Sequence, residues 1–250
     1  MGNPVLSEKV FNKAHAQEGT EVMTVKGTAF KSIVLIFMVL AGAAYTWKVF
    51  NESINPASVT PWMWGGLIGG FVVAIIISFK PNLAQYLAPV YAVLEGLFLG
   101  AISAMFNQAF AESAPGIVVN ATLLTILTAV AMLVIYRTGL IKVNGKFIKI
   151  ISAAVGAVAL YYLVNMVLSL FGVNLVMLHN SGPLSIGISL VIIGVAAFSL
   201  LVDFNFIEKS AEQGAPKYME WYGAFALMVT LIWLYLEILK LLGKFAGSRD

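Results

Sequence analysis

Seven stretches of mostly apolar residues recur along the chain, and short polar connections separate them. All but the first approach or exceed the roughly 20 residues that a helix needs to cross the hydrocarbon layer of a membrane. The first is short and is expected to include Phe30 and its neighbours, whereas the sixth can extend to Ser210. The pattern predicts seven transmembrane helices, at Ser32–Trp47, Pro61–Phe79, Leu83–Phe106, Ile117–Tyr136, Ile148–Val173, Leu184–Val202 and Trp221–Leu242.

Composition supports a membrane location for these stretches. Hydrophobic residues make up 60% of the 250 residues and charged residues only 11%, against about 25% charged in a soluble domain. One core cannot bury that much apolar surface, so the surplus must face lipid. We therefore expect an all-α integral membrane protein, with a polar tail over residues 1–30, a seven-helix domain over 31–245 and a short tail over 246–250.

The distribution of lysine and arginine predicts that the N-terminus is cytoplasmic. With that orientation, eleven of the fifteen basic residues fall on the cytoplasmic side, as the positive-inside rule requires. The four on the other side are Lys48, Lys240, Lys244 and Arg249. No cleavable signal peptide is evident in the first 30 residues, and the net charge of +3 does not indicate a nucleic-acid surface.

The sequence lacks the residues that most enzyme and cofactor sites use. It has no cysteine and two histidines, His15 and His179, so we expect no zinc site, no cofactor and no enzymatic activity. Two segments, "GGLIGG" (65–70) and "EGLFLG" (95–100), contain glycines with the four-residue spacing that lets helices approach closely. We interpret both as helix-packing motifs.

Three acids lie within the predicted helices: Glu95 in the third, Asp203 at the inner end of the sixth and Glu237 in the seventh. An ionised side chain at mid-bilayer costs about 2.5–3.5 kcal/mol on insertion scales, so three of them suggest function. Two carboxyl groups in contact tend to share one proton, and their ionised oxygens suit a hard cation such as Ca²⁺. They are therefore candidates for a pH-sensitive cation site.

Whether these acids meet is uncertain from their depths. At a rise of about 1.5 Å per residue, Glu95 and Glu237 have similar depths, but Asp203 and Glu237 differ by about 10 Å. Simpler interpretations also exist. Asp203 can be the first polar residue after a span, Glu237 can pair with Lys240 near the outer interface, and Glu95 can make a structural hydrogen bond. Asn165 in the fifth span can join helices or line an ion pathway.

Several segments together resemble the Bax inhibitor-1 family of membrane proteins, in particular its bacterial branch. They are "LYLEILKLL" from Leu234 in the last helix, "SLLVDFNFIE" around Asp203, "GAPKYMEWYGAF" and the early "TVKGTAFKS". The resemblance covers nearly all of the chain beyond residue 24. It implies a bundle of seven helices with a short cytoplasmic loop before the last.

The resemblance also implies a mechanism. In that family, acids on the sixth and seventh helices form a hydrogen-bonded, proton-sharing pair linked to a pH-sensitive calcium leak, and by position these acids are Asp203 and Glu237. The chain departs from the family in having Glu rather than Asp on the last helix. It also lacks the charged cluster on the second helix that bacterial relatives carry, and Glu95 is a candidate substitute.

Two functions follow as hypotheses. The first is a pH-gated leak channel for cations, calcium foremost, in which Asp203 and Glu237 hold the gating proton and contact the ion. The second is a regulator without flux that binds another membrane protein, such as a quality-control protease, through its N-terminal tail. In either case we expect the bacterial inner membrane as the location. A receptor or retinal protein fits poorly, because receptors of that kind place the N-terminus outside and Lys240 lies too near the helix end for a Schiff base.

Overall fold

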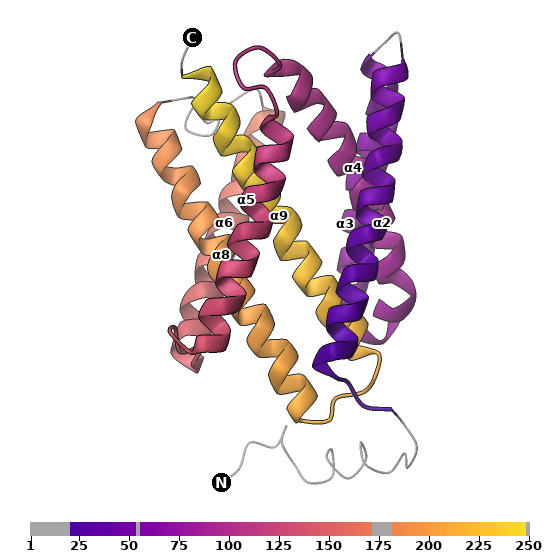
Figure 1. The fold of residues 1–250 in the computed structure, drawn as a ribbon, viewed down its shortest axis with the longest axis vertical. Coiled ribbons are helices and arrows are strands. Elements are labelled where there is room, and N and C mark those ends of the chain that lie inside the picture. The colour runs from indigo at the N-terminus through magenta and orange to yellow at the C-terminus, as the bar shows by residue number, and fades with distance from the viewer. Residues whose placement is uncertain (1–20, 54–55, 172–181, 249–250) are drawn as a thin grey trace.

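The computed structural model describes residues 21–53, 56–171 and 182–248. Within these ranges it contains seven helices that are long and apolar enough to cross a membrane, and no β-strand. They are α2 (Val25–Glu52), α3 (Thr60–Phe79), α4 (Ala84–Ala109), α5 (Ile117–Thr138), α6 (Gly145–Leu170), α8 (Pro183–Glu212) and α9 (Met219–Gly247). The seven-helix prediction is confirmed, and Figure 1 shows how these helices are arranged.

Helices α2 and α8 differ most in length from the sequence prediction, and local chemistry explains one difference. Helix α2 begins at Val25 rather than near Phe30 because the Thr24 side chain accepts a hydrogen bond from the Gly27 amide. Such an N-cap satisfies an amide that has no partner within the helix. Helix α8 runs past Val202 to Glu212, so the longer form of the sixth helix is correct and Asp203 lies inside it.

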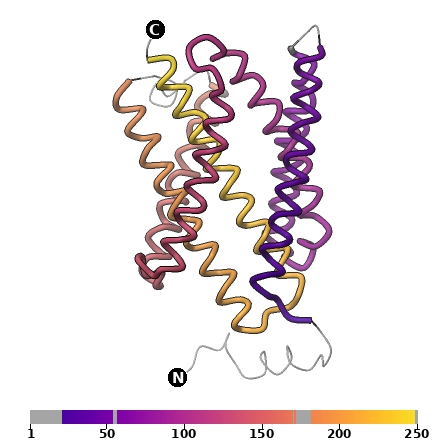
Figure 2. Tube along the Cα trace, viewed as in Figure 1, coloured from indigo at the N-terminus to yellow at the C-terminus, as the bar shows by residue number. Residues whose placement is uncertain are grey.

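Helices α2, α3 and α4 form one closely packed group, seen on one side of the bundle in Figures 1 and 2. Glycines make this approach possible. A Cβ atom placed on Gly96 or Gly100 of α4 would collide with the α2 backbone at Val39 or Ala43, and one on Gly66 of α3 would collide with the α4 backbone. The predicted packing role of both glycine motifs is therefore confirmed.

Helices α8 and α9 are antiparallel neighbours that join beside the start of α2 (Figure 2). Helix α9 contacts both parts of the bundle. One buried cluster joins it to α2, α3 and α4 around Tyr91 and Phe225, and another joins it to α5 and α8 around Leu200 and Leu234. Helix α9 is therefore the central element of the fold, which explains why half of its apolar window is buried.

Helix α6 lies at the periphery and has little of its length buried. It packs mainly on α8. Large apolar side chains such as Phe37, Phe71 and Leu163 are exposed on the outside of the bundle, where lipid would cover them. Val25, Arg137 and Glu208 line one pocket. The start of α2 therefore lies at the same end of the bundle as Arg137, one of the basic residues predicted to be cytoplasmic. That this end faces the cytoplasm stays a prediction from charge.

Candidate functional site

Asp203 lies between three helices and is bound by a hydroxyl group. Its Oδ2 atom accepts a hydrogen bond of 2.6 Å from Oγ1 of Thr230 on α9. Next to this pair is a cavity of about 290 Å³, lined by α6, α8 and α9 and including Ser152 and Ser199. Asp203 is the one charged residue among those that line the cavity. A cation in this space would therefore meet one carboxylate and three neutral hydroxyl groups.

Glu237 is bound in a different way and at a different level. Its side chain is almost fully buried, and its Oε1 atom accepts hydrogen bonds from the Tyr162 hydroxyl at 2.8 Å and from Lys240 Nζ at 2.7 Å. Lys240 also lies over the Tyr162 ring, 4.7 Å from its centre. The sequence alternative that paired Glu237 with Lys240 is thus what the structure contains. We call these three residues the outer lock.

Asp203 and Glu237 do not form the hydrogen-bonded pair that the resemblance implied. Among the described residues, the partner of Asp203 on α9 is Thr230, seven residues before Glu237. Seven residues of α-helix rise about 10 Å, which equals the depth difference predicted for the two acids. Nor does the described part of the chain contain a cluster of three or more Asp, Glu, His or Cys side chains, so a joint calcium site between the two acids is not preformed.

The two acids nevertheless lie at two levels of the same region between α6, α8 and α9. On α9, Thr230, Glu237 and Lys244 follow each other at seven-residue intervals, so they share one helix face. Lys244 Nζ contacts α8 through Oγ of Ser189 at 2.8 Å and the carbonyl oxygen of Ser185 at 3.4 Å. We call the set the polar seam; it lies between α6, α8 and α9 and comprises Ser152, Tyr162, Ser185, Ser189, Ser199, Asp203, Thr230, Glu237, Lys240 and Lys244.

The other two predicted site residues have different positions. Glu95 is buried on α4 beside Tyr91, and a Cβ atom on Gly70 of α3 would lie 2.7 Å from its Oε1. Glu95 thus packs between α3 and α4, away from the polar seam. Asn165 lies on α6, one turn beyond Tyr162, and its Oδ1 atom is buried without a hydrogen-bond partner. Most of the N-terminal tail, to which the regulator hypothesis assigned partner binding, lies outside the described residues. His15 and His179 also lie outside them.

The most completely bonded carboxylate is one that sequence reasoning missed. Glu220 at the start of α9 is fully buried. It accepts hydrogen bonds from the Thr24 amide at 2.9 Å and the Thr24 hydroxyl at 2.8 Å, and it forms ion pairs with Lys31 and Lys217. Glu220 lies in a polar connection, where an acid is not unusual, so the sequence pattern did not select it. The sequence also does not show that residues 21–24 fold back onto this connection.

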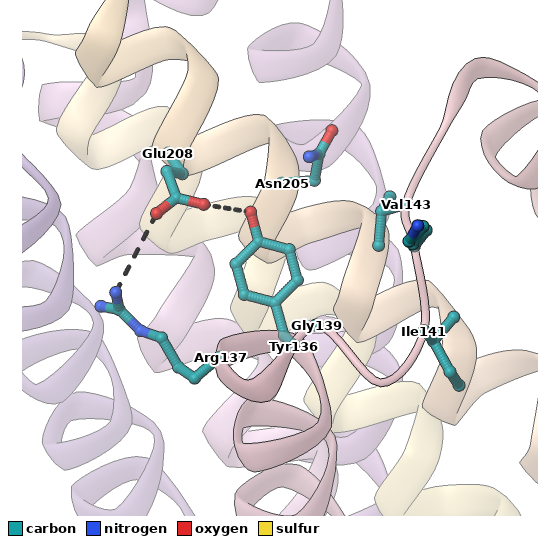
Figure 3. Close-up of a pocket in the computed structure, with 8 residues that line it drawn as sticks. Tyr136, Arg137, Gly139, Ile141, Val143, Asn205 and Glu208 are labelled. Carbon is teal, nitrogen blue, oxygen red and sulfur yellow. Dashed lines mark hydrogen bonds and ion pairs between the residues drawn. The ribbon is translucent and has the colours of Figure 1, made fainter.

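A second missed cluster lies at the end of the bundle where α5 meets α8. Figure 3 shows the Tyr136 hydroxyl and the Arg137 guanidinium group pointing at the carboxylate of Glu208. The Arg137 ion pair measures 3.9 Å and its side chain is largely exposed. These residues line a pocket of about 260 Å³ with Asn205 and the backbone at Gly139. The cluster ties α5 to the extended part of α8.

Comparison with known families agrees with this architecture. A family model described as Bax inhibitor 1 like matches residues 3–247, nearly the whole chain. The chain belongs to the Bax inhibitor 1 like family. A search of curated proteins and a search of solved structures each found no match. The family resemblance inferred from sequence is thus confirmed, and with seven apolar helices this family member is an integral membrane protein in contact with the lipid bilayer.

Proposed function

We propose that this Bax inhibitor 1 like protein is a pH-sensitive leak pathway for cations, calcium among them, and that the path follows the polar seam. The observation that carries the proposal is the cavity of about 290 Å³ between α6, α8 and α9, in which Asp203 is the single charged lining residue. Polar groups within a membrane span are costly and are retained where they line a path or a cavity.

The pH dependence would come from Asp203. When its carboxylate is ionised, the cavity carries one negative charge and attracts a cation. Protonation removes that charge, because no other acid or base is among the residues that line the cavity. The three neutral hydroxyl groups that remain hold no cation strongly. Cation flux should therefore fall as the pH falls. Asp203 would act alone in the cavity, rather than by sharing a proton with Glu237.

The outer lock would close the other end of the path. Lys240 neutralises Glu237 at 2.7 Å, and the Tyr162 hydroxyl binds the same carboxylate oxygen. A cation moving outward meets this neutral pair and then the positive charge of Lys244. Electrostatic repulsion by the ammonium group opposes its passage, so conduction requires the lock to open. Glu237 would then be free to contact the ion.

Reconstituted liposomes loaded with a calcium-sensitive dye test this proposal. Calcium entry would be followed over a series of pH values for the wild-type protein and for Asp203→Asn, which keeps an acceptor for the Thr230 hydroxyl but has no charge at any pH. The expected result is a wild-type flux that rises with pH and a variant flux that is low and independent of pH.

The matched control is Glu52→Gln, since Glu52 is an exposed acid at the end of α2 whose side chain is 68% accessible. It should retain the wild-type pH profile. The assignment to Asp203 is wrong if Asp203→Asn, reconstituted to the same protein-to-lipid ratio, shows the wild-type profile. The function itself is wrong if protein-containing liposomes admit calcium no faster than empty liposomes at any pH.

A further inference from the structure

Lys244 occupies an unusual position for a lysine. It lies near the outer end of the polar seam, and its ammonium group contacts two residues of α8 that are 97% buried, Ser185 and Ser189. Both contacts are to neutral oxygens. Among the described residues, no carboxylate forms an ion pair with Lys244. Lys244 is partly buried, and an ammonium group partly removed from water without a counter-charge is costly, so this charge calls for an explanation.

Within the described ranges, three buried polar atoms on the neighbouring helices also lack hydrogen-bond partners. They are the Tyr161 hydroxyl and Asn165 Oδ1 on α6, and the Ser185 hydroxyl on α8. Buried polar groups are nearly always hydrogen-bonded, so unpartnered ones point to a bound water molecule or ion. Both hydroxyls can donate. The Asn165 amide can also present its NH₂ group, because its oxygen and nitrogen are assigned by the surrounding hydrogen bonds.

Antiparallel register brings these groups to about the same depth. Asp203 of α8 and Ser152 of α6 line the same cavity and so lie at one depth. Tyr162 and Asn165 lie ten and thirteen residues further along α6. Because α8 runs antiparallel to α6, they are opposite the part of α8 around Ser189. Lys244 reaches Ser189 directly. At the outer end of the seam an ammonium group, two hydroxyls and an amide therefore lie at similar depth on three neighbouring helices.

The charges in this region do not cancel. Among the described residues, which end at residue 248, Glu237 and Lys240 are the charged side chains that act electrostatically on Lys244, and they already neutralise each other at 2.7 Å. Within that part of the chain one positive charge remains. A single negative charge would balance it, whereas a divalent anion would leave an excess negative charge that the membrane interior disfavours.

We propose that the outer end of the polar seam binds a monovalent anion, held by Lys244 with the hydroxyl of Ser185 and the side chain of Asn165. Two sources supply such an anion at a membrane: free chloride and the phosphodiester group of a phospholipid. The site lies beyond the outer lock, and it requires no cation flux through the protein.

A different explanation for Lys244 is that the carbonyl end of α9 stabilises it, since a cation in the last turn of a helix is favoured. That interaction needs no ligand and gives no dependence on the anion. It also leaves the Ser185 hydroxyl without a partner. Sensitivity to the anion present therefore distinguishes the two explanations.

The test measures the Tm of the full-length protein in detergent by circular dichroism. Chloride is titrated against gluconate at constant ionic strength. A bound anion stabilises the folded state in a saturable way, so the wild-type Tm should rise by about 3 °C between concentrations well below and well above the dissociation constant. A second arm holds the protein in gluconate and compares lipid nanodiscs of phosphatidylcholine with nanodiscs that also contain phosphatidylglycerol.

Two variants and one control complete the design. Lys244→Met keeps the length of the side chain without its charge and should abolish the Tm rise, whatever its own Tm. Ser185→Ala should weaken the rise. Lys146→Met, at an exposed lysine in the first turn of α6, should leave it unchanged and so corrects for general salt effects.

Each outcome is decisive. A chloride-dependent Tm that Lys244→Met abolishes establishes chloride as the anion. A Tm that responds to phosphatidylglycerol but not to chloride, again only with Lys244 present, establishes the lipid phosphodiester. A Tm that responds to neither, or a response that persists in Lys244→Met, overturns the proposal.

Discussion

The ion pair between Lys31 and Glu220 offers the sharpest test of what holds α9 in place. Lys31 lies on α2 and Glu220 at the start of α9; the Glu220 side chain is 0% exposed and that of Lys31 only 14%. Replacing Lys31 by Met keeps an unbranched side chain of similar length but leaves the buried carboxylate without its nearest cation.

The expected cost follows from the partners that remain. Removal of one partner from a buried ion pair costs about 3–5 kcal/mol. Glu220 keeps both hydrogen bonds from Thr24 and the more distant Lys217 at 3.4 Å, which favours the lower end of that range. Loss of the contact between Lys31 and the Trp221 ring, at 5.5 Å, adds about 0.5–1 kcal/mol. We expect a loss of about 3–4 kcal/mol in the free energy of unfolding.

Helix α2 also supplies a matched control. Lys48 pairs with Glu52 at 3.8 Å, and their side chains are 70% and 68% exposed. Such exposed pairs contribute about 0.3–0.5 kcal/mol, so Lys48→Met should be almost neutral. Unfolding would be followed by circular dichroism as the mole fraction of SDS in mixed micelles increases. Tryptophan fluorescence is unsuitable, because Lys31→Met changes the surroundings of Trp221 even in the folded protein.

The double variant Lys31→Met/Glu220→Gln checks the cause. If the loss comes from an uncompensated buried carboxylate, removal of that charge should restore part of the stability lost in Lys31→Met. The electrostatic reasoning is refuted if Lys31→Met and Lys48→Met have the same free energy of unfolding within about 0.5 kcal/mol. That threshold is about the largest deviation from additivity that distant substitutions usually show.

Two further predictions address the helix packing and the outer lock. Gly96→Ala should cost about 1–3 kcal/mol by overpacking, because its Cβ atom would collide with the Val39 backbone. Gly65→Ala faces open space and should be neutral or stabilising by up to about 1 kcal/mol; equal values for the two in the SDS titration would contradict the close approach of α2 and α4. Lys240→Met should raise calcium flux into liposomes at neutral pH, because Glu237 loses its cation; a flux at or below that of wild type would exclude the lock as a barrier.

The sequence by itself determined the class of the protein and the positions of its helices. Hydrophobicity is a local property, and a span of about 20 apolar residues has few alternatives in a membrane. It therefore predicted the seven membrane-spanning helices of the described residues, the packing glycines and the family. It also identified Asp203 and Glu237, because an acid in an apolar stretch is visible without a structure. The depth estimate from the helical rise, which separated those two acids by about 10 Å, was a better guide to their contacts than the family pattern.

Only the tertiary structure decided which side chains meet. The hydroxyl that binds Asp203 is 27 residues away, the tyrosine that binds Glu237 is 75 away, and the lysine that binds Glu220 is 189 away. These pairings depend on how each helix is rotated and tilted against its neighbours. Rotation and tilt are set by side-chain packing over the whole bundle, not by any single apolar stretch. The hydrophobic pattern places a residue at a depth in the membrane, and packing then determines which side chain it faces.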